Sequence, residues 1–180
     1  VGTLFNTTSF TDTTLWTNKG SGVVTIGAGK LQFSSGNNDY IRRLKFIQPQ
    51  MFEKWQWEAK IISTVKDATS YGFALGVEST NTNNAWKYGV AVRFVGQTGA
   101  DQGKLQVVYL VNGTPTVLAT STSAITFSAN DTISVIVKRE QGRIFAEAWN
   151  VTTNASRSSV EQNYSFAAAS NAIPNTGQFS

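Results

Sequence analysis

WQWEAKI (55–61), YGFALGV (71–77) and WKYGVAVRF (86–94) are the three segments that decide the fold of this chain. Each alternates large apolar residues with small or polar ones. Alternation with a period of two is typical of a β-strand that is buried on one face. We therefore predict three consecutive antiparallel strands between Trp55 and Val95.

The second face of these three strands carries mostly small side chains. If the strands lie side by side in chain order, one row of polar and charged residues lies beside two rows of small residues. Charged residues also lie at the ends of the last row. The rows are Gln56, Glu58 and Lys60; Gly72, Ala74 and Gly76; and Lys87, Gly89, Ala91 and Arg93. This arrangement predicts a shallow trough. The glycines have a second interpretation, because glycine in a strand also marks sheet curvature or a bulge.

The composition excludes several kinds of catalytic and metal-binding site. The chain has 180 residues and contains neither cysteine nor histidine. It therefore has no Ser-His-Asp or Cys-His nucleophile, no zinc site of the usual nitrogen and sulfur type, and no imidazole acid or base. The length fits a single domain spanning residues 1–180.

The charge pattern indicates an extracellular β protein. Charged residues make up 14% of the chain, against about 25% in typical soluble domains. The net charge of +4 is dispersed apart from Arg42, Arg43 and Lys45, which argues against a nucleic-acid partner. No run of about 18 apolar residues exists, so we expect no membrane insertion. The first residues do not resemble a signal peptide, and we expect either a mature chain or a domain of a larger secreted or cell-surface protein.

Further strands follow from alternation and turn signals. Hairpins are predicted at 23–34, at 104–119 around Asn112-Gly113, and at 132–150, with the polar segment 120–131 crossing between sheets. In the last hairpin Ile144, Ala146 and Ala148 make the better core face, so Phe145, Glu147 and Trp149 face the other way. About eleven strands and no convincing amphipathic helix predict an all-β fold, a two-sheet antiparallel β-sandwich. We also expect a helical turn at 165–170 and a last strand at 178–180.

The order of these motifs resembles the concanavalin A-like lectin and glucanase superfamily, which includes laminin G-like and carbohydrate-binding jelly rolls. The resemblance rests on short motifs spread over nearly the whole chain. They are Phe10-Thr11-Asp12 with Trp16, Gly29-Lys30-Leu31, Trp57-Glu58-Ala59-Lys60-Ile61, the hairpin from Ile133 to Trp149, and Thr176-Gly177. The resemblance implies a jelly roll of the concanavalin A-like type, with carbohydrate bound on a concave sheet face or at the loop rim.

The same resemblance provides a test for catalysis. Glucanases of the superfamily carry a Glu-x-Asp-x-x-Glu run on one concave strand, and this chain has none. Glu53 and Glu58 come nearest, but their odd spacing puts them on opposite faces of a strand. This departure argues against an enzyme of the glucanase type.

Aromatic rings and charged groups are the residue types that bind sugars. Flat rings cover the C–H patches of a pyranose, while carboxylates and Arg hydrogen-bond its hydroxyls. Trp55, Trp57, Trp86 and Tyr88 are interpreted as core residues, because large aromatics dominate sandwich cores. The candidate ligand-binding residues are Gln56, Glu58, Arg93, Glu147 and Trp149.

These candidates have alternative roles. Glu58, Arg93 and Glu147 each fit one half of a cross-strand ion pair, and Trp149 fits packing under a loop. Glu58 and Glu147 also fit the acid and nucleophile of a retaining glycosidase, if their carboxyl groups lie about 5 Å apart.

Two kinds of modification or cofactor stay open at this point. No cofactor is certain, but a structural calcium ion fits the loop residues Asp12, Asp39, Asp67, Asp101 and Asp131, with no spacing that selects a ligand set. Glycosylation sequons begin at Asn6, Asn112, Asn130, Asn150, Asn154 and Asn163 and matter only in a eukaryotic secretory pathway.

Three functions are therefore compared. The first is a non-catalytic carbohydrate-binding module that holds an oligo- or polysaccharide on the trough face or its rim, next to neighbouring domains of a larger chain. The second is a glycoside hydrolase of jelly-roll type that uses Glu58 and Glu147. The third is a structural or adhesive domain that binds a protein.

Overall fold

A computed structural model describes residues 16–18, 23–27, 30–34, 41–43, 54–62, 70–78, 86–111, 114–140, 143–154 and 157–163. Every regular element in these ranges is a β-strand. The strands are β1 (Trp16–Asn18), β2 (Val23–Gly27), β3 (Lys30–Ser34), β4 (Ile41–Arg43), β5 (Lys54–Ile62), β6 (Ser70–Glu78), β7 (Trp86–Val95), β8 (Leu105–Val111), β9 (Thr114–Thr120), β10 (Thr132–Glu140), β11 (Arg143–Asn150) and β12 (Ser158–Asn163). Within the described part of the chain, no helix is suited to crossing a membrane.

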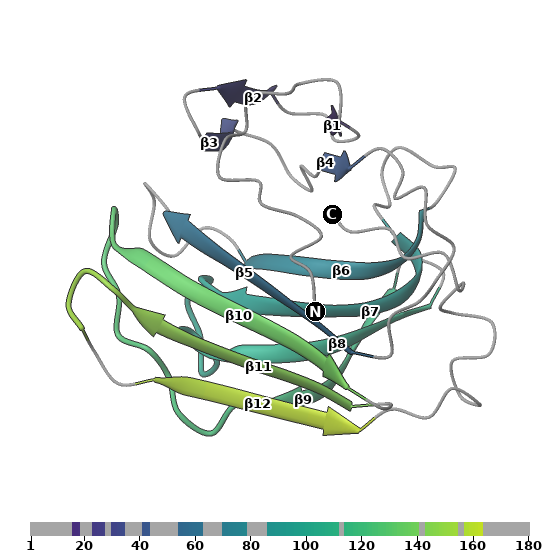
Figure 1. Ribbon diagram of the computed structural model, residues 1–180. Helices are drawn as coiled ribbons and strands as arrows, with labels where there is room; N and C mark the ends of the chain where they lie inside the picture. Colours follow the sequence, from purple (N-terminus) through teal and green to yellow (C-terminus); the bar gives the residue numbers. More distant parts are fainter. Residues whose placement is uncertain are drawn as a thin grey trace.

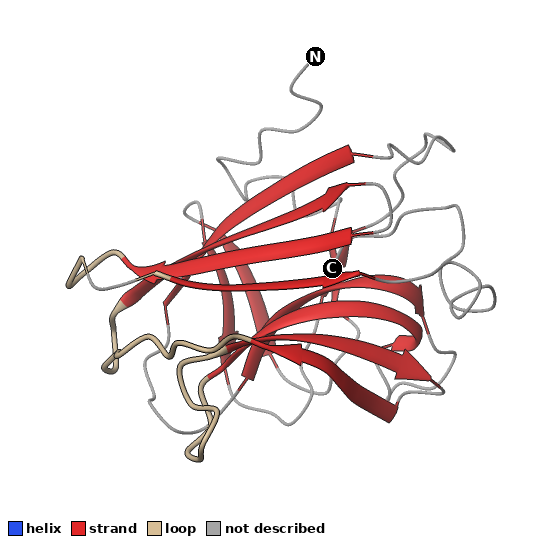
Figure 2. Ribbon diagram, turned by 90° about the horizontal axis from the view of Figure 1, so that it is seen from below, coloured by secondary structure: helices blue, strands red, loops and turns tan. Residues whose placement is uncertain are grey.

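Two four-stranded antiparallel sheets form the two layers of the fold. One has the order β12-β11-β10-β5 and the other β6-β7-β8-β9. Figure 1 shows the first sheet in front of the second, and Figure 2 shows the two layers stacked. Two small pairs, β1 with β4 and β2 with β3, lie at one edge of these layers in Figure 1. The predicted all-β, two-sheet antiparallel sandwich is confirmed.

The core lies between the two layers and follows the alternation of each strand. From β10 and β11 it takes Ile133, Val135, Val137, Ile144, Ala146 and Ala148, as predicted. Val90, Val92 and Phe94 of β7 and Leu105 and Val107 of β8 face them from the other sheet. Phe94 packs edge-on against Phe127, with ring centroids 5.2 Å apart. Burial of these side chains supplies the main favourable free energy of folding.

The segment between β9 and β10 crosses from one sheet to the other, as predicted. Its Ile125 and Phe127 enter the core. Its Ser121 lies at the join between the layers, where its Oγ is 2.8 Å from Ser158 Oγ of β12 and accepts the Leu105 N–H of β8 at 3.1 Å. The crossing segment thus closes one end of the sandwich with bonds to both sheets.

The prediction that the three segments between Trp55 and Val95 lie side by side is wrong. β6 and β7 do pair, with Gly72 opposite Arg93 and Ala74 opposite Ala91. β5 belongs to the other sheet, where all nine of its residues pair with β10, from Lys54↔Glu140 to Ile62↔Thr132. Alternation reports which side chains share a face of one strand, whereas the partner strand depends on pairing between residues far apart in the chain.

Other differences concern the ends of the chain. β12 was not predicted, because its sequence SSVEQN has a single large apolar residue, Val160. The helical turn expected at 165–170 and the strand expected at 178–180 lie outside the described residues. The side chains of Trp55, Trp57, Trp86 and Tyr88, interpreted as core, also lie outside them.

Candidate functional site

The outward face of the β12-β11-β10-β5 sheet carries four of the five candidate residues. Because Ile133, Val135 and Val137 point into the core, their neighbours in the chain point outward. The register aligns three rows across β5, β10 and β11: Gln56, Lys138 and Phe145; Glu58, Ile136 and Glu147; and Lys60, Ser134 and Trp149. We call these nine residues, with Arg157 beside them, the Trp149 face.

Trp149 is held in place by an arginine from the adjoining strand end. The Arg157 guanidinium lies over the indole, with its central carbon 4.6 Å from the ring centroid. The same guanidinium pairs with Glu147, with 3.1 Å between Nη1 and Oε1. The Arg157 side chain is 61% exposed, against 23% for Glu147, so this pair contributes about 0.5 kcal/mol to stability. The pair also places the guanidinium over an outward-facing indole.

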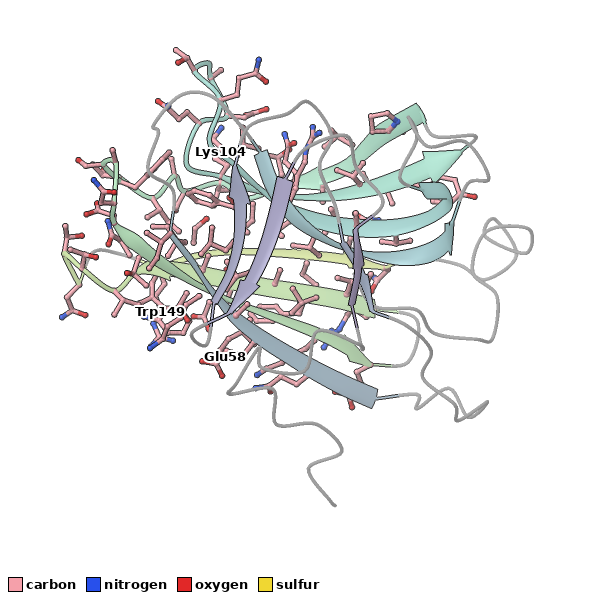
Figure 3. The ribbon with its side chains drawn as sticks, turned by 90° about the horizontal axis from the view of Figure 1, so that it is seen from above. Glu58, Lys104 and Trp149 are labelled. Atoms are coloured by element: carbon pink, nitrogen blue, oxygen red, sulfur yellow. The ribbon has the colours of Figure 1, made fainter. Side chains whose placement is uncertain are left out.

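Glu58 lies two strands away from Glu147 on the same face. Ile136 stands between them in the register, and Figure 3 shows Glu58 and Trp149 on one side of the sandwich. Gln56, Glu58 and Lys60 are all exposed. Among the described residues, none pairs with these three side chains. Within the described ranges, the interpretation as half of an ion pair thus fits Glu147 but not Glu58.

The separation of the two glutamates bears on the glycosidase alternative. Adjacent strands are about 4.8 Å apart, so the backbones at Glu58 and Glu147 are about 10 Å apart. The Glu147 carboxylate bonds to Arg157, which lies on the β12 side of β11 and away from β5. A retaining glycosidase needs its two carboxyl groups about 5 to 5.5 Å apart. This arrangement does not fit that mechanism.

Arg93 does not join the other candidates, because it lies on the outward face of the second sheet. Val90, Val92 and Phe94 of its strand point into the core, so Arg93 points away from it. Its register neighbours are Gly72 on β6 and Gln106 on β8. We call Gly72, Ala74, Ala91, Arg93 and Gln106 the Arg93 face. In Figure 3, Lys104, which lies next to this face, is on the side of the sandwich opposite Trp149 and Glu58.

A network of amide and charged groups organises the Arg93 face. Arg93 donates its Nε–H to Gln106 Oε1 at 2.8 Å. Gln106 Nε2 donates to Asp101 Oδ2 at 3.1 Å and to Thr120 Oγ1 at 3.3 Å. Asp101 also pairs with Lys104 at 3.0 Å. The small residues of β6 and β7, from which a trough is predicted, therefore belong to this face without β5.

The aspartates considered for calcium have other partners where they are described. Asp101 accepts from Lys104 and Gln106, and Asp131 accepts from Asn150 Nδ2 and the Ser128 N–H. No group of three or more acidic side chains suited to a metal occurs among the residues that the structure describes. Asp12, Asp39 and Asp67 lie outside them, so a calcium ion stays a prediction.

The sequence predictions missed three residues of these faces. Arg157 lies in a polar segment with no strand pattern of its own. Gln106 is buried, with 4% exposed surface, although it occupies an outward position. Ser134 is 1% exposed, and its Oγ has no hydrogen-bond partner. Alternation with Val135 would have placed Ser134 on the outward face, but no sequence signal indicates that it is buried there.

Comparison with known proteins supports the fold. No family model and no curated protein sequence matches the chain. Among solved structures, it is similar to the carbohydrate binding module CBM66 from Bacillus subtilis, with a TM-score of 0.56 and 14% identity over 92% of this chain and 84% of that one. It is also similar to the enzymatically active domain of bacteriophage CBA120 tailspike protein 2, with a TM-score of 0.51 and 15% identity over 92% of this chain.

The two matches cover different shares of the solved structures. The chain spans 25% of the tailspike domain, whereas it spans most of the carbohydrate binding module. At 14 to 15% identity the similarity establishes a shared fold and does not carry function with it.

Proposed function

We propose that this chain is a non-catalytic carbohydrate-binding module that holds a glycan on the Trp149 face. One observation carries the proposal: an outward-facing indole, covered by Arg157, shares a sheet face with Glu147 and with Glu58, which is exposed and has no partner among the described residues. An indole covers the C–H patch of a pyranose, and carboxylates accept hydrogen bonds from its hydroxyls. The fold shared with a carbohydrate binding module over most of both chains supports this assignment.

Each candidate residue has a role in this proposal. Trp149 provides the stacking surface, and Glu147 and Arg157 bond the hydroxyls of the stacked ring. Gln56, Glu58 and Lys60 on β5 lie about 10 Å from β11, which is the length of about two sugar rings. The face thus suits an oligosaccharide that crosses the strands from β11 to β5. In this proposal the chain works as one module of a secreted or cell-surface protein.

The experiment combines a binding assay with an assay for cleavage. We expect gels containing a matching polysaccharide to retard the protein without releasing new reducing ends. Trp149→Ala should weaken retardation about thirtyfold, the typical loss when a central aromatic contact is removed. Trp149→Phe, which keeps a flat ring, should retain most of the binding. Thermal unfolding of each variant checks that the fold is intact.

Three results would contradict the proposal. Equal retardation of Trp149→Ala and the unmodified chain would remove the Trp149 face as the site. New reducing ends that disappear in Glu58→Gln would favour the hydrolase. Binding to no polysaccharide in a broad panel would favour an adhesive domain that binds protein.

A further inference from the structure

The Arg93 guanidinium has unused hydrogen-bonding capacity. Within the part of the chain that the structure describes, only its Nε–H is engaged, by Gln106 Oε1 at 2.8 Å. Among the described residues, no carboxylate pairs with Arg93, and its two terminal nitrogens have no acceptor. A guanidinium presents five N–H donors in a planar fork that matches a carboxylate with two parallel bonds. Arg93 thus presents one complete edge of this fork to a ligand.

Gln106 fixes the direction of this fork. The side chain is 96% buried, since 4% of its surface is exposed. Its Nε2 donates to Asp101 Oδ2 and Thr120 Oγ1, which leaves Oε1 to accept from Arg93. The hydrogen-bond partners therefore determine which end of the amide is the oxygen and which is the nitrogen. An arginine held by a buried and fully bonded amide loses little conformational entropy when it binds a ligand, and this preorganisation favours affinity.

The local charges favour an anion. Two cations, Arg93 and Lys104, and one anion, Asp101, lie around Gln106. Asp101 pairs with Lys104 at 3.0 Å, so the positive charge of Arg93 is uncompensated within this group. Arg93 is also partly buried, which weakens screening of its charge by salt.

The neighbouring rows carry small residues beside Arg93. The residue opposite Arg93 on β6 is Gly72, and the next pair along this face is Ala74 and Ala91. These positions carry at most a methyl group. Small residues at these positions suit the approach of a sugar ring whose acidic group meets Arg93.

We propose that the Arg93 face is a second binding site, which takes the carboxylate of an acidic sugar such as a uronic acid. This inference rests on the proposed carbohydrate-binding function and extends it to charged glycans. The two sites lie on opposite faces of the sandwich, because Trp149 and Arg93 point away from the core on different sheets, and they act on different parts of a ligand. The Trp149 face stacks on the ring, whereas the Arg93 face pairs with a charge.

The test uses the full chain in gels that contain polygalacturonate, its methyl ester or neutral galactan. We expect retardation by polygalacturonate to fall at least about tenfold on esterification, because the ester cannot form the charge-assisted bonds. Arg93→Gln should cause a loss of the same size. Arg93→Lys, which keeps the charge but not the fork, should also lose most of the binding. Arg143→Gln, which removes an exposed arginine that belongs to neither face, is the matched control and should leave the ester difference unchanged.

The results separate this inference from the proposed function. Equal retardation by polygalacturonate and its ester, or binding that survives Arg93→Gln, overturns the acidic site even when neutral glycans still bind through Trp149. Full binding by Arg93→Lys, or equal retardation by dextran sulfate, identifies general attraction of anions and also overturns it. Retardation by no polysaccharide at all overturns both. Because Arg93→Lys retains the size and charge of the side chain, it provides the test if Arg93→Gln does not fold.

Discussion

The two outward faces of the sandwich each contain one buried polar side chain, and the two side chains are partnered in opposite ways. Gln106 on the Arg93 face is 4% exposed and has hydrogen bonds at both ends of its amide. Ser134 on the Trp149 face is 1% exposed, and its hydroxyl has no partner. A buried polar group without a partner costs about 1 to 3 kcal/mol. The Arg93 face is therefore organised by internal bonds, while the Trp149 face depends on Arg157 and Glu147 at its edge.

We expect the largest loss of stability from a substitution of Gly103, in the loop between the strands that carry Arg93 and Gln106. Gly103 has φ near +79°, and a Cβ atom there would lie 2.2 Å from the backbone oxygen of Ile125. The Gly103 N–H donates to Val95 O at 2.7 Å. This bond stabilises the loop that joins the strand of Arg93 to the strand of Gln106. Gly103→Ala should lower the free energy of unfolding by about 4 kcal/mol, through backbone strain and steric overlap. Chemical denaturation measures this change.

The control for this substitution is Gly99→Ala. Gly99 also has a positive φ, but a Cβ atom there would meet nothing within 4 Å. Because a substitution at either position is strained by its φ, the difference between the two variants reports mainly the overlap with Ile125. Equal losses would show that backbone conformation alone sets the cost.

The end of β11 that carries Trp149 is stabilised by Asn150, the residue that follows Trp149. Asn150 is fully buried, and its Nδ2 donates to Thr126 O and Asp131 Oδ2, while its Oδ1 accepts the Thr152 N–H. Asn150→Ala should cost about 3 kcal/mol, because buried groups lose their partners. It should also weaken glycan binding, since the turn that leads to Arg157 is released.

Asn163→Ala is the matched control, because Asn163 is exposed at the end of β12. We expect it to change the free energy of unfolding by less than about 0.5 kcal/mol. A loss at Asn150 no larger than at Asn163 would contradict the role of the buried amide.

The smallest effect tests the comparison between Ser134 and Gln106 directly. Ser134→Ala removes a buried hydroxyl without a partner and should stabilise the chain by about 1 kcal/mol. Gln106→Leu should act in the opposite direction, because Arg93, Asp101 and Thr120 lose their hydrogen bonds to the buried amide. Thermal unfolding of both variants measures the two signs. Destabilisation by Ser134→Ala would show that its hydroxyl has a partner in solution.

Alternation along single strands predicted much of the Trp149 face. It predicts that Phe145, Glu147 and Trp149 lie on the face of β11 opposite to Ile144, Ala146 and Ala148. The structure confirms that Ile144, Ala146 and Ala148 are buried. Gln56 and Glu58 were correctly given one shared face. Arg157 could not be predicted, because it precedes a strand whose sequence has a single large apolar residue and its contact with Trp149 depends on that strand pairing with β11.

The sequence by itself determined the fold class, the chemistry that is excluded by the lack of Cys and His, and the face on which each side chain of a strand lies. These properties are local, since they follow from composition and from the alternation of one strand. Only the tertiary structure decided that β5 pairs with β10 and that Glu58 and Arg93 lie on opposite sides of the sandwich. The neighbours of a strand depend on pairing and core packing between residues far apart in the chain. The local sequence from Trp55 to Val95 therefore does not indicate which strand β5 pairs with.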